Sequence, residues 1–405
     1  MKVPFFRPEI GNEEEAEVLA VLRSGWLTTG PRVRKFEEAF AHAVGGRYAV
    51  AVNSATAALH LAVEALGLGR EPRRHAVLVP TMTFAATAEI VRYMNAVPIL
   101  VDCDQQTLNI DLADAERKLA RAERGQWPAT GAVHVVGIIP VHVGGVMVDL
   151  DRLREFAARR GLWIVEDAAH AFPSAWRKQG SDRWTRCGDD TSAVSCFSFY
   201  ANKTITTGEG GMAVTSNQQI ADRMRLMSLH GLSRDAWNRY SGGGSWDYQI
   251  VAPGFKYNLT DIAAALGIHQ LARAESMRDA RESISLKYSD KFRSIAEVET
   301  PYVGDNTRQS WHLYPIRLHL ERLTITRNVF MDALQKKGVG CSVHWRPLHL
   351  HPYYGETFGW MPDDFPIASR EWERLISLPL FPSMSTEEID HVVESVSSIC
   401  AAHRR

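Results

Sequence analysis

Short apolar runs alternate with helical stretches from about Tyr48 to Ser216, and this alternation limits the possible folds more than any other feature of the chain. Runs such as Tyr48–Val52 and His75–Val79 have the apolar and β-branched content of buried strands. The helical stretches between such runs include Thr83–Met94, Asp111–Ala122 and Leu150–Arg160. Strands that alternate with helices build mostly parallel sheets covered by those helices. The sequence therefore predicts an α/β protein with a mostly parallel central sheet and helices on both faces.

The C-terminal part of the chain follows a different pattern, which predicts a second, smaller unit. We expect a large domain over residues 1–258 and, over residues 259–405, a linker helix followed by a small α+β domain. The linker helix is predicted from Thr260 to about Ile295. The small domain is predicted to contain strands at Leu313–Leu318 and Val339–Trp345, a helix at Asn328–Lys337 and a C-terminal helix from Thr386. The Gly-rich stretch from Ser233 to Pro253 has the length of a substrate or interface loop.

Lys203 is the residue that most directly indicates chemistry. It follows the strand-like run Ala193–Phe199 and lies in the segment S-F-Y-A-N-K-T-I-T-T-G-E-G-G-M, which begins at Ser198. Partial burial lowers the pKa of a lysine, and its neutral amine condenses with aldehydes to form a Schiff base. Pyridoxal phosphate (PLP) is such an aldehyde, so Lys203 is a candidate for its attachment. The alternative is a surface lysine in a turn, because most lysines are exposed.

A carboxylate for the pyridine nitrogen of PLP is offered by the run Leu162–Asp167, which ends in Glu166 and Asp167. The C-terminal end of a strand faces the crevice where open α/β sheets bind ligands. A carboxylate there keeps the ring nitrogen protonated, so that the ring can withdraw electrons. Successive side chains of a strand point to opposite faces, so only one of the two acids can serve, and their spacing does not choose between them. Asp167 can also be the N-cap of a helix that starts at Ala168.

Two further segments can hold the ring and the phosphate. Phe84 offers a flat apolar face for stacking, although a phenylalanine taken alone is more often part of a core. The segment Asn53–Ala58 joins a strand to a helix, and its small side chains let a phosphate approach the helix N-terminus. Ser198 can add a hydroxyl group. The alternative for Ser54 is a plain N-cap serine.

Composition excludes several other classes of function. The 405 residues carry a formal net charge of -1, so nothing indicates binding to nucleic acid or to a membrane surface. No apolar stretch approaches the length of a membrane span, and the N-terminus lacks a signal-peptide pattern. The five cysteines have no C-x-x-C spacing, which is typical of reduced thiols in a cytoplasmic protein. His344, His349 and His351 have no Cys or carboxylate at ligand spacing, so we expect no metal site.

These segments, in their order along the chain, resemble the DegT/DnrJ/EryC1/StrS family of PLP-dependent nucleotide-sugar aminotransferases, a branch of the aspartate aminotransferase superfamily. The resemblance covers nearly the whole chain and implies PLP fold type I. Beyond the Lys203 segment it rests on S-G-W-L-T-T-G-P from Ser24, N-S-A-T-A-A-L-H-L-A from Asn53, V-E-D-A-A-H-A around Asp167, P-G-F-K-Y-N-L-T-D-I-A-A-A-L-G from Pro253 and V-H-W-R-P-L-H from Val343.

The resemblance also implies a function for each matching position. Lys203 would be catalytic and would carry the Schiff base, and Asp167 would pair with the pyridine nitrogen. The other implied cofactor contacts are Ala55, Thr56 and Ser198 at the phosphate, Phe84 on the ring, His170 near the ring hydroxyl, and Asn258 at the phosphate of the neighbouring subunit. The implied substrate contacts are Thr28, Thr29, Tyr200 and His344. Because Asn258 would reach into the other subunit, the resemblance implies a homodimer with shared active sites. The family often has His at the position of Tyr200 and Gly or Cys at that of Ala55, differences that concern the substrate rather than the chemistry.

The implied reaction moves an amino group from an amino acid, with L-glutamate as the expected donor, to a keto sugar. We expect that sugar to be a nucleoside-diphosphate 4-keto-6-deoxyhexose used in amino-sugar biosynthesis. A 3-keto sugar and a keto-cyclitol (an inosose) are alternatives within the family. Dehydratases of the family that form no Schiff base have His in place of the lysine, and Lys203 argues against them. A PLP-fold sensor or regulator without catalytic activity is the remaining alternative.

Overall fold

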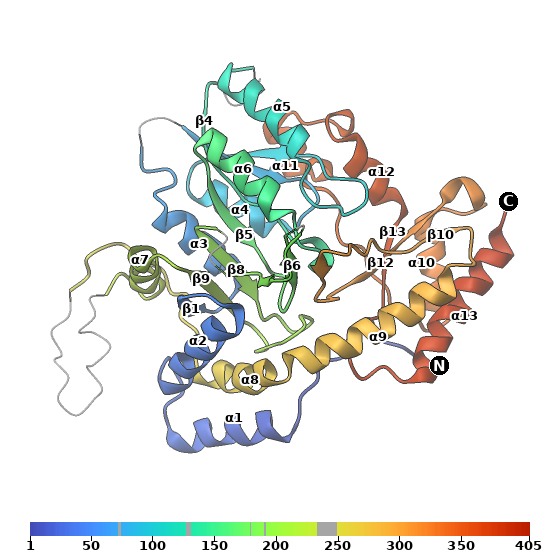
Figure 1. Ribbon diagram of the computed structural model, residues 1–405, viewed down its shortest axis with the longest axis horizontal. Coiled ribbons are helices and arrows are strands. Elements are labelled where there is room, and N and C mark those ends of the chain that lie inside the picture. Colours follow the sequence, from blue (N-terminus) through green and yellow to red (C-terminus); the bar gives the residue numbers. More distant parts are fainter. Residues whose placement is uncertain (72–73, 127–130, 179, 190–191, 233–248) are drawn as a thin grey trace.

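The computed structural model describes residues 1–71, 74–126, 131–178, 180–189, 192–232 and 249–405. Two hydrophobic cores organise these residues into a large and a small unit (Figure 1). The large core surrounds the central sheet. The small core includes Tyr314, Phe330 and Val396, and also Val3 from the N-terminal segment. The division at residues 258 and 259 stays a proposal.

The central sheet has seven strands in the order β1-β9-β8-β5-β4-β2-β3. Their bounds are β1 Tyr48–Val52, β2 His75–Pro80, β3 Val97–Val101, β4 His134–Ile138, β5 Trp163–Asp167, β8 Val194–Ser198 and β9 Gly211–Thr215. Strand β9 is antiparallel to its two neighbours, and the other neighbouring strands pair in parallel. The prediction of a mostly parallel α/β sheet is confirmed.

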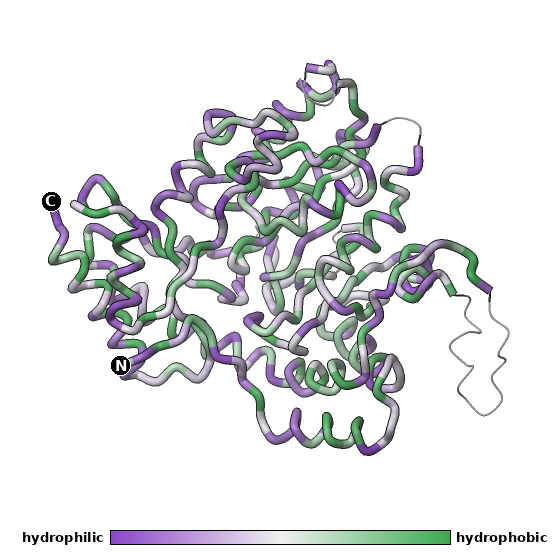
Figure 2. Tube along the Cα trace, turned by 180° about the vertical axis from the view of Figure 1, so that it is seen from behind, coloured by the Kyte–Doolittle hydropathy of each residue, from purple (hydrophilic) through white to green (hydrophobic). Residues whose placement is uncertain are grey.

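Helices cover both faces of this sheet, which explains why its strands read as continuous apolar runs. The helices of the large unit are α1 Asn12–Ser24, α2 Pro31–Val44, α3 Ala55–Ala65, α4 Ala86–Tyr93, α5 Leu112–Glu123, α6 Leu150–Arg160, α7 Gln218–Ser228 and α8 Asp261–Ala272. In the view of Figure 1, α5 and α6 lie in front of the sheet and α3 and α4 behind it. Helix α8 packs against both α1 and α2, and its tube is mostly green in Figure 2.

Helix α9 (Ala274–Phe292) runs from the large unit to the small one (Figure 1). The small unit contains the sheet β10-β12-β13 and two flanking helices. Its elements are β10 Val298–Glu299, β12 Tyr314–Leu318, α10 Arg327–Lys336, β13 Leu375–Leu378 and α13 Thr386–His403. The remaining elements are the short 3-10 turn η1 Val143–Gly145, β6 Ala175–Arg177, β7 Trp184–Arg186, β11 Thr307–Arg308, the 3-10 turns η3 Leu320–Arg322, η4 Leu348–Leu350 and η5 Pro362–Asp364, α11 Pro352–Phe358 and α12 Pro366–Arg374.

The predicted strand Val339–Trp345 is wrong. This segment makes only isolated bridges, from Val339 to Val3 and from Ser342 to Ser377. Because its backbone hydrogen bonds go to two different segments, no continuous ladder forms. The bridge at Val339 fixes the N-terminal segment to the small unit.

The predicted linker helix from Thr260 to Ile295 is two helices. They are separated at Arg273, whose guanidinium reaches back to the carbonyl oxygen of Glu9 and to the carboxylate of Glu14. The helix predicted from Thr83 begins only at Ala86. Residues 233–248 of the Gly-rich stretch lie outside the described residues, so its function as a loop stays a prediction. In the part of the chain that the structure describes, no helix is both long and apolar enough to cross a membrane.

Candidate active site

Lys203 lies in a turn just after β8, where its backbone N–H donates to the carbonyl oxygen of Tyr200 at 2.9 Å. Its side chain is half-buried, and its Nζ lies 3.5 Å from Nε2 of His312. Burial lowers the pKa of the Lys203 amine from 10.5 to about 8, although the nearby charge of Asp167 acts in the opposite direction. The amine is therefore partly neutral near physiological pH, as a nucleophile or a base must be. The alternative of a solvated surface lysine is wrong.

Asp167 ends β5 and is buried. Its Oδ2 accepts a hydrogen bond from Thr87 Oγ1 at 2.7 Å, and its Oδ1 accepts one from the backbone N–H of Ala169 at 3.2 Å. Burial raises the pKa of the Asp167 carboxyl, and the two hydrogen bonds and the charge of Lys203 counteract this in part. The described residues directly after Asp167, 168–174, form turns and no helix, so the N-cap alternative is excluded. The carboxylate is oriented and poorly solvated, which suits a partner for a cationic ring nitrogen.

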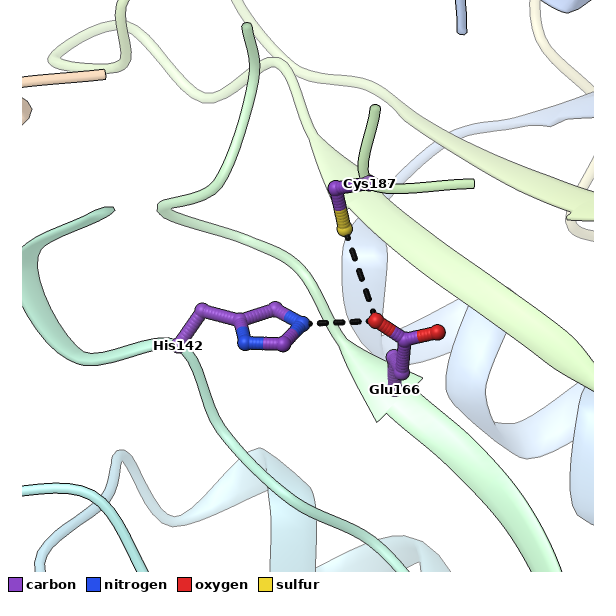
Figure 3. A group of neighbouring side chains, drawn as sticks. All are labelled: His142, Glu166 and Cys187. Atoms are coloured by element: carbon purple, nitrogen blue, oxygen red, sulfur yellow. Dashed lines mark hydrogen bonds and ion pairs between the residues drawn. The ribbon is translucent and has the colours of Figure 1, made fainter. Parts of the chain in front are cut away.

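Glu166 belongs to a different buried cluster (Figure 3). Its Oε2 accepts a hydrogen bond from His142 Nε2 at 2.7 Å and a longer one from Cys187 Sγ at 3.6 Å. Its Oε1 accepts one from Ser195 Oγ at 3.1 Å. The geometry therefore leaves Asp167, and not Glu166, on the side of Lys203.

The three ligand-type side chains of this cluster lie within 4.8 Å of one another, which raises the question of a metal ion. The backbone N–H of Val148 donates to His142 Nδ1 at 3.1 Å, so the proton of the neutral ring must sit on Nε2. That proton points at Glu166 and occupies the position that a metal would need. We interpret the cluster as a hydrogen-bonded acid that anchors the end of β5.

Three imidazoles gather around Lys203. The ring centroid of His170 lies 4.2 Å from that of His312, and His170 stacks on Trp345 at 4.9 Å. His344 also contacts Trp345, and its Nδ1 pairs with Ser377 Oγ at 2.9 Å. Burial and the charge of Lys203 lower the pKa of all three histidines, that of His344 to about 4. The group therefore surrounds the lysine amine with neutral rings.

Of these residues, the sequence analysis missed His312. It comes from the segment between β11 and β12, 109 residues after Lys203. A histidine within the otherwise apolar run W-H-L-Y was the one available signal. A small cavity of about 10 Å³ lies on another side of the lysine, lined by Asn202, Arg281 and the N-terminal residues 6–9.

The predicted phosphate site lies at the N-terminus of α3. Ser54 is the N-cap, because its hydroxyl accepts from the N–H of Ala57 at 3.1 Å, and the N–H groups of Ala55 and Thr56 precede the first intrahelical donors. A Cβ at Gly211 would lie 2.4 Å from the backbone of Ser54, so only glycine allows β9 to pass this close under the turn. Ser54 is therefore an N-cap, and the N–H groups of Ala55 and Thr56 are available to an anion, while the phosphate site itself stays a prediction.

The remaining predicted residues are placed as follows. Phe84 is 63% exposed, so the alternative of a core residue is wrong and its ring face is open. Tyr200 is 47% exposed, and its backbone N–H donates to Ser198 Oγ at 3.3 Å. A separate group beside the end of β1 contains Thr28, Thr29 and Asn258. Asn258 forms a backbone bridge with Val52, and its Nδ2 donates to Thr29 Oγ1 at 2.7 Å. The carbonyl oxygen of Thr28 accepts a hydrogen bond from the backbone N–H of Asp261. Among the described residues, no hydrogen bond links this group to Lys203.

These groups fit PLP. An amine of lowered pKa lies near a buried acid, a neutral imidazole contacts the amine, and a helix N-terminus follows β1. The open ring of Phe84 provides an apolar surface.

Comparisons with known proteins agree with this arrangement. The sequence profile of the DegT/DnrJ/EryC1/StrS aminotransferase family matches residues 8–397. Over 400 residues the chain is 43% identical to the spore coat polysaccharide biosynthesis protein SpsC of Bacillus subtilis, with 98% of this chain and 97% of that protein covered.

Solved structures give the same result. Spr1654 from Streptococcus pneumoniae in its PLP-form has a TM-score of 0.86 and 30% identity to this chain, with 99% of both chains covered, and the same protein is also solved in a PMP-form. Helicobacter pylori PseC, an aminotransferase involved in the biosynthesis of pseudoaminic acid, has a TM-score of 0.86 and 26% identity, over 99% of this chain and 100% of that one.

These matches span the whole architecture and include a PLP-bound structure, which confirms PLP as the cofactor and fold type I as the fold. They make the chain an enzyme and remove the alternative of a sensor or regulator. The chain belongs to the DegT/DnrJ/EryC1/StrS aminotransferase family and is a PLP-dependent sugar aminotransferase.

Proposed function

We propose that this enzyme transfers an amino group from L-glutamate to a nucleoside-diphosphate-linked 4-keto-6-deoxyhexose. The observation that best supports the transfer is the half-buried amine of Lys203, with its pKa of about 8, opposite the buried carboxyl of Asp167. Bound PLP would supply the aldehyde that carries the amino group between the donor and the keto carbon. We place the keto group at C4 of the sugar because the Lys203 segment resembles that of enzymes that make 4-amino-6-deoxy sugars.

The side chains of this chain supply the proton transfers and the orientation. Lys203 takes a proton at Nζ from the donor carbon and returns it, for which a pKa near the working pH is best. Asp167 would pair with the ring nitrogen of PLP, and its hydrogen bonds from Thr87 and Ala169 fix the direction of its carboxylate. His170 accepts the N–H of Gly144 at Nδ1, at 3.3 Å, so the proton of its neutral ring sits on Nε2, from which it would donate to the ring hydroxyl of PLP.

We also propose that Ala55, Thr56 and Ser198 bind the phosphate and that Phe84 stacks on the ring. For the sugar we propose Thr28, Thr29, Tyr200 and His344. The relatives support a sugar substrate by their names, since SpsC is a spore coat polysaccharide biosynthesis protein and Spr1654 is described as a sugar aminotransferase. The free cysteines among the described residues support a location in the cytoplasm.

The function is tested with the purified enzyme and a panel of ketones. Glutamate alone should shift the visible absorbance of the bound cofactor to the near ultraviolet, and a nucleotide-linked 4-keto-6-deoxyhexose should then restore it and gain an amino group, seen by mass spectrometry. Lys203→Ala is the matched control and should do neither. Amination of a 3-keto sugar or of an inosose, but not of the 4-keto sugar, would refute the proposed substrate.

We further propose a homodimer in which Asn258 serves the phosphate site of the partner. Apolar side chains exposed on and after α1 support a partner surface: Leu19, Leu22, Trp26 and Leu27. A hollow of about 810 Å³ lies next to Asn258 and Thr29, between α2, β1 and α7. A closed dimer with two-fold symmetry is the simplest assembly in which each subunit completes the other.

Mixed subunits test this arrangement. Lys203→Ala and Asn258→Ala chains should each be nearly inactive, and their mixture should form hybrid dimers with one intact site and regain activity. Subunit exchange is verified with two affinity tags. Activity of a monomer in sedimentation, or a verified hybrid without activity, would show that the sites are not shared.

A further inference from the structure

We propose that His312 is a positioning residue for the catalytic lysine: its neutral imidazole accepts a hydrogen bond at Nε2 from Lys203 Nζ and so sets the direction in which the amine takes and gives protons. This inference rests on the proposed transfer at Lys203 and adds to it a residue from the small unit. It needs no new reactant, because only the orientation of the amine is at issue.

Geometry provides the first argument. Nζ of Lys203 and Nε2 of His312 lie 3.5 Å apart, and the imidazole is 5% exposed. Its other nitrogen, Nδ1, is buried and has no hydrogen-bond partner among the described residues. A purely structural histidine in a core satisfies its nitrogens, because a buried nitrogen without a partner destabilises the fold. His312 therefore makes its one polar contact with the catalytic amine.

Charge decides which partner donates. Burial lowers the pKa of the His312 ring well below 6.5, and the neighbouring His170, Lys203, Arg281 and His344 act in the same direction. The ring is thus neutral and carries one proton. An ammonium at Lys203 can only donate, so Nε2 must accept and the proton sits on Nδ1. When Lys203 is neutral, the same contact holds one of its N–H bonds and leaves its lone pair free for the proton transfer.

The backbone around His312 is held by the large unit, as a positioning residue requires. The hydroxyl of Ser310 donates to the carbonyl oxygen of His170 at 2.5 Å, and its N–H donates to Ser174 Oγ at 2.9 Å. Trp311, the residue between Ser310 and His312, is buried and has a φ of 52°, a left-handed conformation that is unfavourable for a bulky residue. The fold retains this strained backbone directly before the residue that meets Lys203.

The test measures the lysine itself, in apoenzyme freed of cofactor. Competitive acetylation over a range of pH, read by peptide mass spectrometry, gives the midpoint at which Lys203 becomes reactive, and exposed Lys287 on α9 serves as the internal standard. Wild type should have a midpoint of about 8. His312→Phe keeps a ring for packing but removes the acceptor, so the midpoint should fall by about one unit. His312→Gln keeps an acceptor and should stay close to wild type.

A wild-type midpoint in folded His312→Phe, checked by circular dichroism, would overturn the proposal. If that variant fails to fold, His312→Leu decides by the same criterion. If the Leu variant also fails, the His312→Gln variant decides, because a structural role predicts a displaced midpoint there as well. In the holoenzyme, His312→Phe should lower kcat about tenfold with little change in KM for glutamate. Because the acetylation uses no sugar and no amino donor, a wrong substrate assignment cannot produce either outcome.

Discussion

Replacing Lys203 by methionine should stabilise the apoenzyme at neutral pH, although it abolishes catalysis. Burial lowers the pKa of the amine from 10.5 to about 8, which is a difference of about 2.5 units. At 1.36 kcal/mol per unit, the folded state gives up about 3 kcal/mol to keep an ammonium in this position. Methionine has a similar length and no charge, so Lys203→Met should raise the free energy of unfolding by at most ~3 kcal/mol at pH 7.

The dependence of the free energy of unfolding on pH shows whether the charged lysine destabilises the fold. The pKa of Lys203 is lower in the folded state than in the unfolded state, so charging this lysine destabilises the fold. The penalty is absent above pH 10.5, grows as the pH falls from 10.5 to about 8, and is complete below about 8. The advantage of the methionine variant should therefore be constant below pH 8 and decline between pH 8 and 10.5. Urea unfolding of both apoenzymes across this range measures it, with Lys287→Met, an exposed position on α9, as the control for composition. A difference between Lys203→Met and wild type that does not change with pH would refute the reasoning.

Three further predictions follow from the site. Asp167→Asn should still bind PLP but lose about 10²–10³ in kcat, because the amide cannot balance a protonated ring nitrogen; steady-state kinetics measure this, and near-normal turnover would contradict it. Gly211→Ala would place a Cβ 2.4 Å from the Ser54 backbone. It should therefore lower the free energy of unfolding by about 1–3 kcal/mol in urea and weaken PLP binding in titrations. Unchanged values for both would contradict the close approach. Cys187 and Cys196 should resist a thiol reagent in the native protein up to about pH 9, because burial raises both thiol pKa values. Both should react once the chain is unfolded. Labelling of either cysteine in the native protein, detected by mass spectrometry, would contradict their burial.

The central sheet could be predicted because its strands are encoded locally. Each is a short apolar run bounded by helical sequence, and each is buried on both faces, so burial and pattern agree. Lys203 and Asp167 follow or end such runs, which made them recognisable as site residues. Strand Val339–Trp345 has the same local pattern but no continuous neighbour, and this depends on the tertiary structure alone.

The site could be predicted only in part for the same reason. The spacing could not choose between Glu166 and Asp167, because the choice depends on which face of β5 meets Lys203. His312 approaches from 109 residues away, through the docking of the segment before β12 on the large unit. No local pattern encodes that approach. Contacts of this kind are visible only once the two units are assembled.

The attachment of the N-terminal segment to the small unit has a consequence for how the chain matures during translation. Val3 bridges Val339, Arg7 pairs with Glu388 across 381 residues of sequence, and residues 6–9 line the cavity beside Lys203. The strands of the central sheet leave the ribosome long before Val339 and Glu388 do, so the sheet can assemble while this wall of the pocket still lacks its anchors. Closing so long a loop is entropically costly and comes late. A nascent chain should therefore present Lys203 to the cofactor from an open side, and that side closes only once synthesis has passed the anchors in the small unit.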